Sequence, residues 1–337
     1  MAPPRAAILG VAGPRLGASE RAFLREADPW GVILFERNVS DAPQLTALTS
    51  EIREALGREA VIFTDQEGGR VQRLGPPRWP RWEDAGAMVA GLDDAAAEEA
   101  MTLRFRLIAE DLRGVGIDAD CAPVLDLALP GADPIIGARA VSDDPERVGR
   151  LGRAARRGLE AGGVRPVIKH APGHGRADMD SHLGPPTVAA DRETLEATDF
   201  APFRANADAA MAMTAHVVFA ALDPGRCATL SPEIIALIRG EIGFAGLLMS
   251  DDLSMGALSG PMRARAEAAL AAGCDIVLHC NGDPAEAAAV MEAAPALSGA
   301  ALSRAEAAAR PLAPEAGFDA AAARARLAAL TGRDALA

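Results

Sequence analysis

The chain has 337 residues, half of them hydrophobic, which indicates a packed globular fold with a large core rather than a disordered chain. Its formal net charge of −13 argues against nucleic acid or an anionic membrane surface as a partner, although local basic residues could still bind a small acidic substrate. No apolar run reaches about 18 residues and the N-terminal run is too short for a signal peptide, so we expect a cytoplasmic monomer without a membrane segment.

Short apolar runs alternate along the chain with longer stretches rich in Ala, Glu and Arg, which is typical of βα units and a parallel sheet. Eight runs are predicted as strands, at residues 6–11, 31–35, 60–64, 117–124, 166–170, 210–215, 246–250 and 274–278. They are continuously apolar, as expected of strands buried on both faces.

The intervening segments have helical composition, at residues 18–27, 42–56, 95–115, 144–161, 194–207, 232–240 and 262–272. Ser231 before Pro232 is a helix start signal, and Gly273 stands where a helix should stop. Eight strands with helices between them predict a single (β/α)8 barrel domain over residues 1–337, with a doubly wound open sheet as the alternative. The Ala- and Arg-rich tail from about residue 298 is predicted to form one or two helices packed on the barrel.

The chain has four cysteines, and no two of them form a CxxC pair. They are Cys121, Cys227, Cys274 and Cys280. Because most of them stand in or beside predicted strands, we expect reduced core residues rather than disulfides or metal ligands.

The C-terminal ends of the predicted strands carry most of the chain's reactive side chains. Barrel enzymes build their active sites at these ends. Four of the five histidines, His170, His174, His182 and His216, follow the fifth and sixth predicted strands, and Asp251 follows the seventh. This clustering predicts a functional site.

Three chemistries could use such a cluster. A metal site could draw on the side chains of His170, His174, Asp178, Asp180 and His182, but the first strand has no HxH pair of the kind that barrel metallohydrolases use. A serine nucleophile is disfavoured because the chain has no G-x-S-x-G segment. Glycoside hydrolysis needs a carboxylate and a proton donor, and these could be Asp251 and a histidine held by an acid, as Asp180 and His182 offer.

The sequence of these segments resembles a known family. KHAPGHG over residues 169–175 with DSH over 180–182, SDDLSM over 250–255 and DQEGGRVQR over 65–73 are similar to motifs of the bacterial β-N-acetylglucosaminidases of glycoside hydrolase family 3. GVILF over 31–35 with Arg37 and Asn38 matches a further stretch, and all matches follow the family's order. Two departures are Ala171, where the family usually has a bulky residue, and Arg176-Ala177.

The resemblance implies roles for individual residues. Asp251 would be the nucleophile of a retaining hydrolase, His182 the proton donor and acceptor, and Asp180 the group that orients His182. The substrate-binding residues would be Asp65, Arg73, Arg139, Lys169 and His170. His174 and His216 would brace the loop that carries His182.

The resemblance also implies the substrate, a muropeptide in which N-acetylglucosamine is linked to 1,6-anhydro-N-acetylmuramic acid, met in cell-wall recycling. It implies neither a cofactor nor a metal. Two alternatives remain at this point: an N-acetylglucosamine phosphorylase that uses the same residues, and a non-catalytic sugar-binding barrel.

Overall fold

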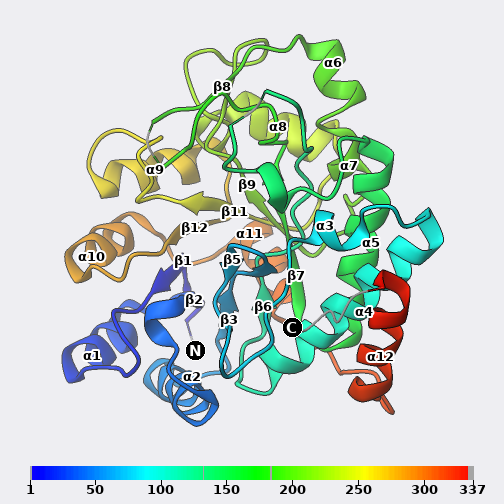
Figure 1. The fold of residues 1–337 in the computed structure, drawn as a ribbon. Coiled ribbons are helices and arrows are strands. Elements are labelled where there is room, and N and C mark those ends of the chain that lie inside the picture. Colours follow the sequence, from blue (N-terminus) through cyan, green and yellow to red (C-terminus); the bar gives the residue numbers. More distant parts are fainter. Residues whose placement is uncertain (1, 132, 183, 333–337) are drawn as a thin grey trace.

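Eight parallel strands close into a barrel in the computed structural model, which describes residues 2–131, 133–182 and 184–332. The order around the barrel is β1-β12-β11-β9-β7-β6-β3-β2, and helices surround the strands (Figure 1). The barrel strands are β1 (Arg5–Gly10), β2 (Pro29–Leu34), β3 (Val61–Thr64), β6 (Ala119–Asp120), β7 (Arg165–Ala171), β9 (Met211–Thr214), β11 (Leu247–Asp252) and β12 (Ile276–His279). The predicted barrel is confirmed, and each predicted strand overlaps one observed strand.

The helices follow the strands in the predicted alternation. They are α1 (Ala18–Ala27), α2 (Ala42–Leu56), α3 (Ala85–Val89), α4 (Asp94–Arg113), α5 (Pro145–Ala161), α6 (Arg192–Ala197), α7 (Ala201–Arg204), α8 (Pro232–Gly240), α9 (Met262–Ala272), α10 (Pro284–Ala293), α11 (Gly299–Ala309) and α12 (Ala320–Thr331). Helices α1, α2, α8 and α9 have the predicted bounds. The prediction missed α3 and α10, although Asp283 before Pro284 is a start signal for α10 and its side chain caps the helix.

Two predicted elements are shorter or divided, and proline explains both. The strand predicted over 117–124 is reduced to β6 because Pro123 has no amide for the ladder, and pairing resumes only as a bridge from Val124 to Lys169. The helix predicted over 194–207 is divided into α6 and α7, with Pro202 in the first turn of α7.

Alternation along the strands separates the barrel interior from its outer face. In β1, Ala6 and Ile8 belong to the interior cluster, whereas Ala7 and Leu9 pack outward against helices. Helix α11 also contributes to the interior cluster, while α12 packs on α4 through Leu327. The four cysteines are buried and free, as predicted.

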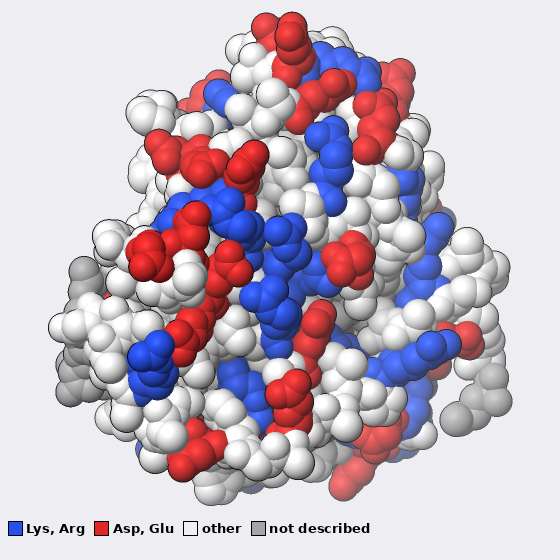
Figure 2. All heavy atoms as spheres, turned by 90° about the vertical axis from the view of Figure 1, so that its right-hand side faces the viewer, with Lys and Arg blue, Asp and Glu red and all other residues white. Residues whose placement is uncertain are grey.

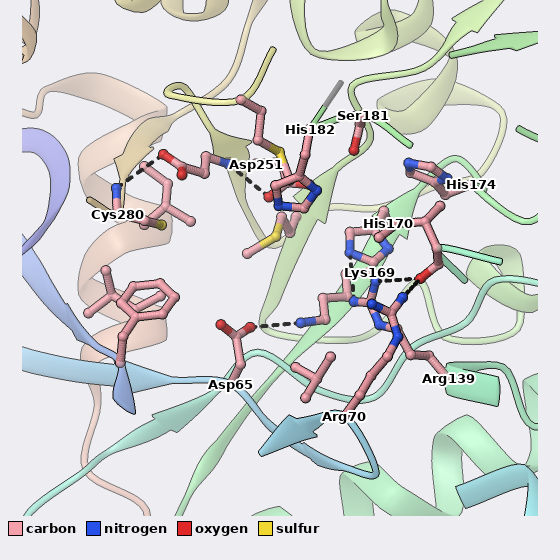
Figure 3. A pocket seen from close by; sticks show the side chains of 18 of the residues that line it. Asp65, Arg70, Arg139, Lys169, His170, His174, Ser181, His182, Asp251 and Cys280 are labelled. Carbon is pink, nitrogen blue, oxygen red and sulfur yellow. Dashed lines mark hydrogen bonds and ion pairs between the residues drawn. The ribbon is translucent and has the colours of Figure 1, made fainter. Parts of the chain in front are cut away.

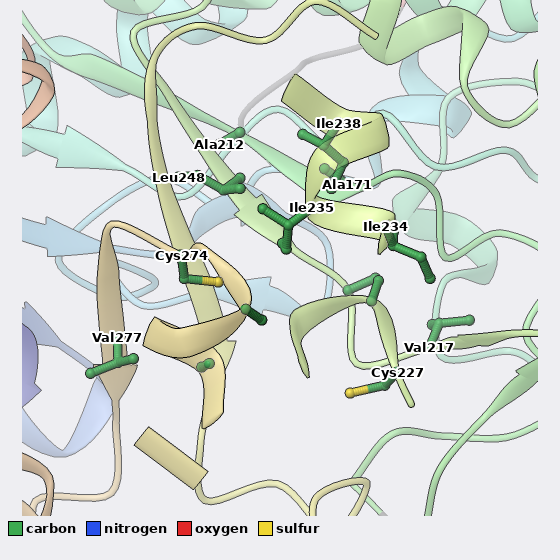
Figure 4. Packing of buried hydrophobic residues seen from close by; sticks show 14 of the residues in the cluster. Ala171, Ala212, Val217, Cys227, Ile234, Ile235, Ile238, Leu248, Cys274 and Val277 are labelled. Atoms are coloured by element: carbon green, nitrogen blue, oxygen red, sulfur yellow. The ribbon is translucent and has the colours of Figure 1, made fainter. Parts of the chain in front are cut away.

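Helix α8 covers β9 and β11 with an isoleucine face. Ile234, Ile235 and Ile238 are buried together with Leu248 of β11 (Figure 4). Gly273 ends α9 with φ of 112°, and a Cβ there would lie 2.9 Å from Cγ2 of Ile235. This close approach fixes α8 against α9 and the strands.

Replacing Ile235 by Ala is expected to lower the free energy of unfolding by about 2–4 kcal/mol, because it leaves a cavity in this cluster. Urea denaturation measures the loss, and Ile235→Val should cost roughly 0.5–1.5 kcal/mol. A loss well below 1 kcal/mol for the alanine variant would show that α8 is not packed as described.

The face formed by α4, α5 and α12 mixes basic and acidic side chains (Figure 2). On α5, Arg150 pairs with Asp94 of α4 at 2.7 Å, and Arg147 pairs with the same carboxylate. On α12, Arg326 pairs with Glu99 at 2.7 Å. Acids from neighbouring helices therefore neutralise much of the positive charge on this face.

Candidate active site

A cavity of about 280 Å³ opens at the C-terminal ends of the barrel strands (Figure 3). Seven of the eight residues predicted to form the site line it, namely Asp65, Arg73, Arg139, Lys169, His170, His182 and Asp251. The eighth, Asp180, does not line the cavity but contacts Nδ1 of His182. The structure therefore brings together side chains from β7, β11 and the loops after β3 and β6.

A buried cluster of charges forms one wall of the cavity, centred on Lys169 of β7. Its Nζ lies 2.8 Å from Oδ1 of Asp65 and 2.7 Å from Oε1 of Glu67. The other oxygens of these acids accept from arginines: Arg73 lies 3.0 Å from Oδ2 of Asp65, and Nε of Arg139 lies 2.9 Å from Oε2 of Glu67. The wall thus presents several fixed donors and acceptors, as recognition of sugar hydroxyls requires.

All members of this cluster are held in their charged forms. Burial acts to raise the pKa of Glu67, but the charges of Arg139 and Lys169 outweigh it and lower the pKa to about 2. In the same way, Lys169 and Arg73 bring the pKa of Asp65 below its ordinary range. Burial lowers the pKa of Lys169, but the two acids outweigh this effect and raise it.

Replacing Glu67 by Gln is expected to lower the free energy of unfolding by about 3 kcal/mol at neutral pH, because two buried cations lose their carboxylate. The folded-state pKa of Glu67 lies below its ordinary value of 4.5, so its contribution is present above that pH and is lost as the pH falls toward about 2. Urea denaturation of both proteins at several pH values tests this. A stability difference that does not shrink in acid would contradict it.

Asp251 ends β11 and reaches the cavity from the other side. It is 8% exposed, and its Oδ1 accepts the Asp252 amide at 2.8 Å. Burial acts to raise its pKa, but positive charge on His170, His216 and Lys169 together with this amide lowers it. Burial lowers the pKa of His216 itself. A buried carboxylate that is kept ionised is suited to attack an electrophilic carbon.

Asp252 also lines the cavity, but its carboxylate is engaged elsewhere. Oδ2 accepts from the Ser254 hydroxyl at 2.6 Å, and Oδ1 accepts from the amides of Ser254 and Cys280. These bonds tie the end of β11 to the residue after β12. Of the two adjacent acids, Asp251 therefore has the freer carboxylate.

His182 and Asp180 form a pair on the long loop after β7. Nδ1 of His182 lies 2.8 Å from Oδ1 of Asp180, and the His182 amide donates to the same oxygen at 2.9 Å. Burial acts to raise the pKa of Asp180, but these bonds lower it, so the carboxylate stays charged and supports a protonated imidazole. The pair is suited to donate and recover a proton through Nε2.

A second acid–histidine pair lies deeper, between Asp126 and His170. Oδ2 of Asp126 lies 2.6 Å from Nδ1 of His170, while Oδ1 accepts the amides of His170 and His174. This arrangement turns Nε2 of His170 toward Arg139, 3.4 Å away. Asp126 is therefore the residue that orients His170 on the cavity wall.

His174 and His216 were both predicted to brace the loop of His182; for His174 this stays a prediction, whereas His216 is placed elsewhere. His174 lines the cavity, with its ring 5.7 Å from that of His170, and burial lowers its pKa to about 4. His216 bonds to the Thr229 hydroxyl at 2.7 Å and to the Asp252 carbonyl at 2.9 Å, so it braces β11 rather than the loop of His182.

The two departures from the family motifs are accommodated. Ala171 is buried in the cluster that contains Leu195 and Phe200. Arg176 pairs with Asp199 at 2.6 Å and donates to the Thr198 hydroxyl, so it fastens the loop to the segment between α6 and α7.

The histidines do not assemble the metal site weighed from the sequence. In the part of the chain that the structure describes, no three His, Cys, Asp or Glu side chains are arranged to hold a metal ion. Asp178 instead accepts the Thr187 amide at 2.7 Å.

The prediction did not single out Arg70, which lines the cavity, nor Glu67 and Asp126, which pair with Lys169 and His170 behind its wall. Glu67 and Arg70 stand in the segment 65–73, and Asp126 follows the fourth predicted strand. Their place after predicted strands was the only available signal, and nothing in the sequence showed which partners these side chains would contact.

Comparison with known proteins agrees with this geometry. Residues 8–311 match the model of the glycosyl hydrolase family 3 N terminal domain. The beta-hexosaminidase of Neisseria meningitidis serogroup C is 41% identical over 285 residues, which cover 82% of this chain and 79% of that protein. The crystal structure of NagZ from Neisseria gonorrhoeae in complex with N-trifluoroacetyl-D-glucosamine superposes with a TM-score of 0.87 at 33% identity, covering 98% of this chain and 99% of that chain. The same enzyme in complex with a zinc ion gives the same values.

A closed barrel with charged and titratable side chains in a cavity at the C-terminal ends of its strands is the architecture of a (β/α)8-barrel enzyme. The chain belongs to glycosyl hydrolase family 3, and it is a β-N-acetylhexosaminidase that resembles NagZ in sequence and structure. The alternative of a non-catalytic sugar-binding barrel is thereby removed. None of the described helices is long and apolar enough to cross a membrane.

Proposed function

We propose that this hydrolase removes terminal β-linked N-acetylglucosamine from muropeptides, in which the sugar is joined to 1,6-anhydro-N-acetylmuramic acid. The observation that carries the proposal is one cavity that combines the Asp251 carboxylate, the His182–Asp180 pair and the charged wall around Lys169. The resemblance to NagZ supports the muropeptide as substrate. We further propose that the chain forms a single catalytic domain. We also propose that the enzyme is a monomer that acts in the cytoplasm during cell-wall recycling.

The proposed reaction has two steps and retains the configuration at C1. A carboxylate oxygen of Asp251 attacks C1 of the sugar while the bond from C1 to the leaving oxygen breaks, and protonated His182 gives its proton to that oxygen. Neutral His182 then takes a proton from water, whose oxygen attacks C1 and displaces Asp251. The Asp180 carboxylate stabilises the cationic form of His182 in each cycle.

Substrate binding in this proposal falls to the charged wall. Asp65, Lys169 and Arg139 would bind the hydroxyl groups remote from C1. Their ion pairs hold these donors and acceptors in fixed positions, as hydrogen bonding to several hydroxyls of one sugar requires. His170 and Arg73 would complete the hydrogen bonds to the sugar, His170 in the orientation that Asp126 imposes.

The experiment that tests the function follows the hydrolysis of a muropeptide by NMR. We expect N-acetylglucosamine to appear first as its β-anomer, with no N-acetylglucosamine 1-phosphate in phosphate buffer and no loss of activity in EDTA. Initial release of the α-anomer would contradict the proposed mechanism, and a sugar phosphate would establish the phosphorylase instead. Activity lost in EDTA would mean that a metal takes part, and hydrolysis of only synthetic glucosaminides would overturn the proposed substrate.

A further inference from the structure

Asp120 is a buried acid that the proposed mechanism does not use. It ends β6, and its side chain is fully buried. Its neighbours Ala119 and Cys121 belong to the interior cluster of the barrel, so alternation along the strand turns Asp120 to the outer face. There Oδ1 accepts the backbone amide of Gln66 at 2.8 Å, across 54 residues of sequence. Oδ2 is also buried and has no hydrogen-bond partner among the residues that the structure describes.

Gln66 connects this buried acid to the charged wall. It stands between Asp65 and Glu67, the two acids of the wall, so its backbone carries both of them. Its side-chain oxygen accepts the Arg73 amide at 2.9 Å, and the Arg73 side chain in turn pairs with Asp65. The hydrogen bond from the Gln66 amide to Asp120 therefore helps to set the position of three charged side chains of the wall.

Arg104 of α4 holds the same segment through the next peptide group. Its side chain is fully buried, and Nη2 donates to the carbonyl of Glu67 at 2.8 Å and to that of Glu83 at 2.7 Å. Gly68 has a φ of 97°, and a Cβ on this residue would lie 1.9 Å from the same nitrogen, so the backbone lies directly against the guanidinium group. The segment that carries the two acids is thus clamped between Asp120 and Arg104.

Asp120 is a neutral carboxylic acid at neutral pH. Burial raises its pKa to about 8, and the negative charges of Asp65 and Glu67 act in the same direction. The Gln66 amide and the charge of Lys169 oppose this rise without outweighing burial. Asp120 therefore contributes a hydrogen-bond acceptor rather than a charge, so asparagine can replace it in both shape and charge.

We propose that Asp120 and Arg104 are positioning residues for sugar binding, which hold the acids of the charged wall in place through the backbone of the segment between them. Neither side chain lines the substrate cavity, so both act through other residues. The inference rests on the proposed role of the charged wall, which is to bind the hydroxyl groups remote from C1. Because a misplacement of about 1 Å spoils such contacts, losing either residue should weaken sugar binding while the catalytic side chains continue to act.

Matched variants separate positioning from a loss of stability. Asp120→Leu removes the acceptor of the Gln66 amide, and Arg104→Met removes the donor to the Glu67 carbonyl. At neutral pH each should raise the dissociation constant of N-acetylglucosamine by about tenfold, measured by titration calorimetry on the full-length enzyme. Asp120→Asn keeps the acceptor and should stay within about twofold of wild type. Ile235→Ala, which is expected to lower stability elsewhere in the barrel, is the control and should leave the constant unchanged.

Further readouts would not follow from a loss of stability. With 4-nitrophenyl N-acetyl-β-D-glucosaminide, Asp120→Leu and Arg104→Met should raise KM by about tenfold, while kcat falls by less than about threefold. Their affinity for N-acetylgalactosamine, which differs only in the configuration at C4, should fall less than their affinity for N-acetylglucosamine. Thermal denaturation confirms that each variant is folded, and Asp120→Ala takes the place of Asp120→Leu if the larger side chain prevents folding.

Asp65→Asn distinguishes this inference from the proposed function. If this variant binds N-acetylglucosamine as tightly as wild type, the charged wall does not bind the sugar, and the proposed site is wrong together with the inference. If Asp65→Asn weakens binding but the Asp120 and Arg104 variants do not, the positioning role is overturned while the proposed function stands. An equal loss of affinity in Ile235→Ala, or equal losses for the two sugars, would also overturn the positioning role.

Discussion

Replacing Asp251 by Ala is expected to lower kcat by roughly 10⁴- to 10⁶-fold, the size of effect seen when an enzyme loses its nucleophile. Substrate binding should survive, because the charged wall around Lys169 does not use Asp251 as a hydrogen-bond partner. The measurement is release of 4-nitrophenol from 4-nitrophenyl N-acetyl-β-D-glucosaminide by wild type and variant. A loss of less than about 100-fold would rule out Asp251 as the nucleophile.

Adding azide tests this prediction through the configuration of the product, which a variant that has merely lost its fold cannot produce. In Asp251→Gly, azide can attack C1 from the face that the carboxylate has vacated, so the product should be the α-glycosyl azide. The neighbouring variant Asp252→Asn is the matched comparison, because it removes a charge one residue away. It should destabilise the bonds to Ser254 and Cys280, lower kcat far less, and yield no α-azide.

The barrel could be predicted because short apolar strands and longer helical segments alternate along the sequence and differ in composition. Each strand is a short apolar run, and both faces of these strands are buried in the structure. Pro123 shortened a predicted strand because it has no amide hydrogen for the ladder, and Pro202 divided a predicted helix because proline is favoured in a first turn. The average composition of a segment does not show the effect of a single proline.

The residues at the site were predictable by type and place, but their pairing was not. Asp180 and His182 are two residues apart, so their contact could be inferred from the sequence. Lys169 meets Asp65 across 104 residues and His170 meets Asp126 across 44, and such contacts depend on barrel closure. The same limit applied to His216, whose partner Asp252 lies on a neighbouring strand.

Replacing His182 by Ala is expected to lower kcat/KM by roughly 10²- to 10⁴-fold for a muropeptide, whose leaving alcohol needs a proton. For 2,4-dinitrophenyl N-acetyl-β-D-glucosaminide, whose leaving group departs unprotonated, the first step should be nearly as fast as in wild type. The glycosyl-enzyme should then accumulate, because no base activates water, and a burst of dinitrophenol would report it. Equal losses on both substrates would contradict the proton-transfer role.

The pH profile separates His182 from Asp251. The pKa of Asp251 is lowered from its ordinary carboxyl value of 3.8, so Asp251 stays ionised above that pH and cannot limit activity on the alkaline side. The alkaline fall of kcat/KM should therefore come from the proton donor rather than from Asp251, and His182→Ala should abolish this fall. Asp180→Asn should move it to lower pH, because the imidazolium loses a carboxylate 2.8 Å away.

Azide completes the distinction between the two residues. In His182→Ala the nucleophile remains, so azide attacks the glycosyl-enzyme in place of water and the product should be the β-glycosyl azide. The α-azide from Asp251→Gly and the β-azide from His182→Ala would together assign the two steps to the two side chains. An α-azide from the His182 variant would require that Asp251 is not the attacking group, since only an enzyme without a covalent intermediate would give that product.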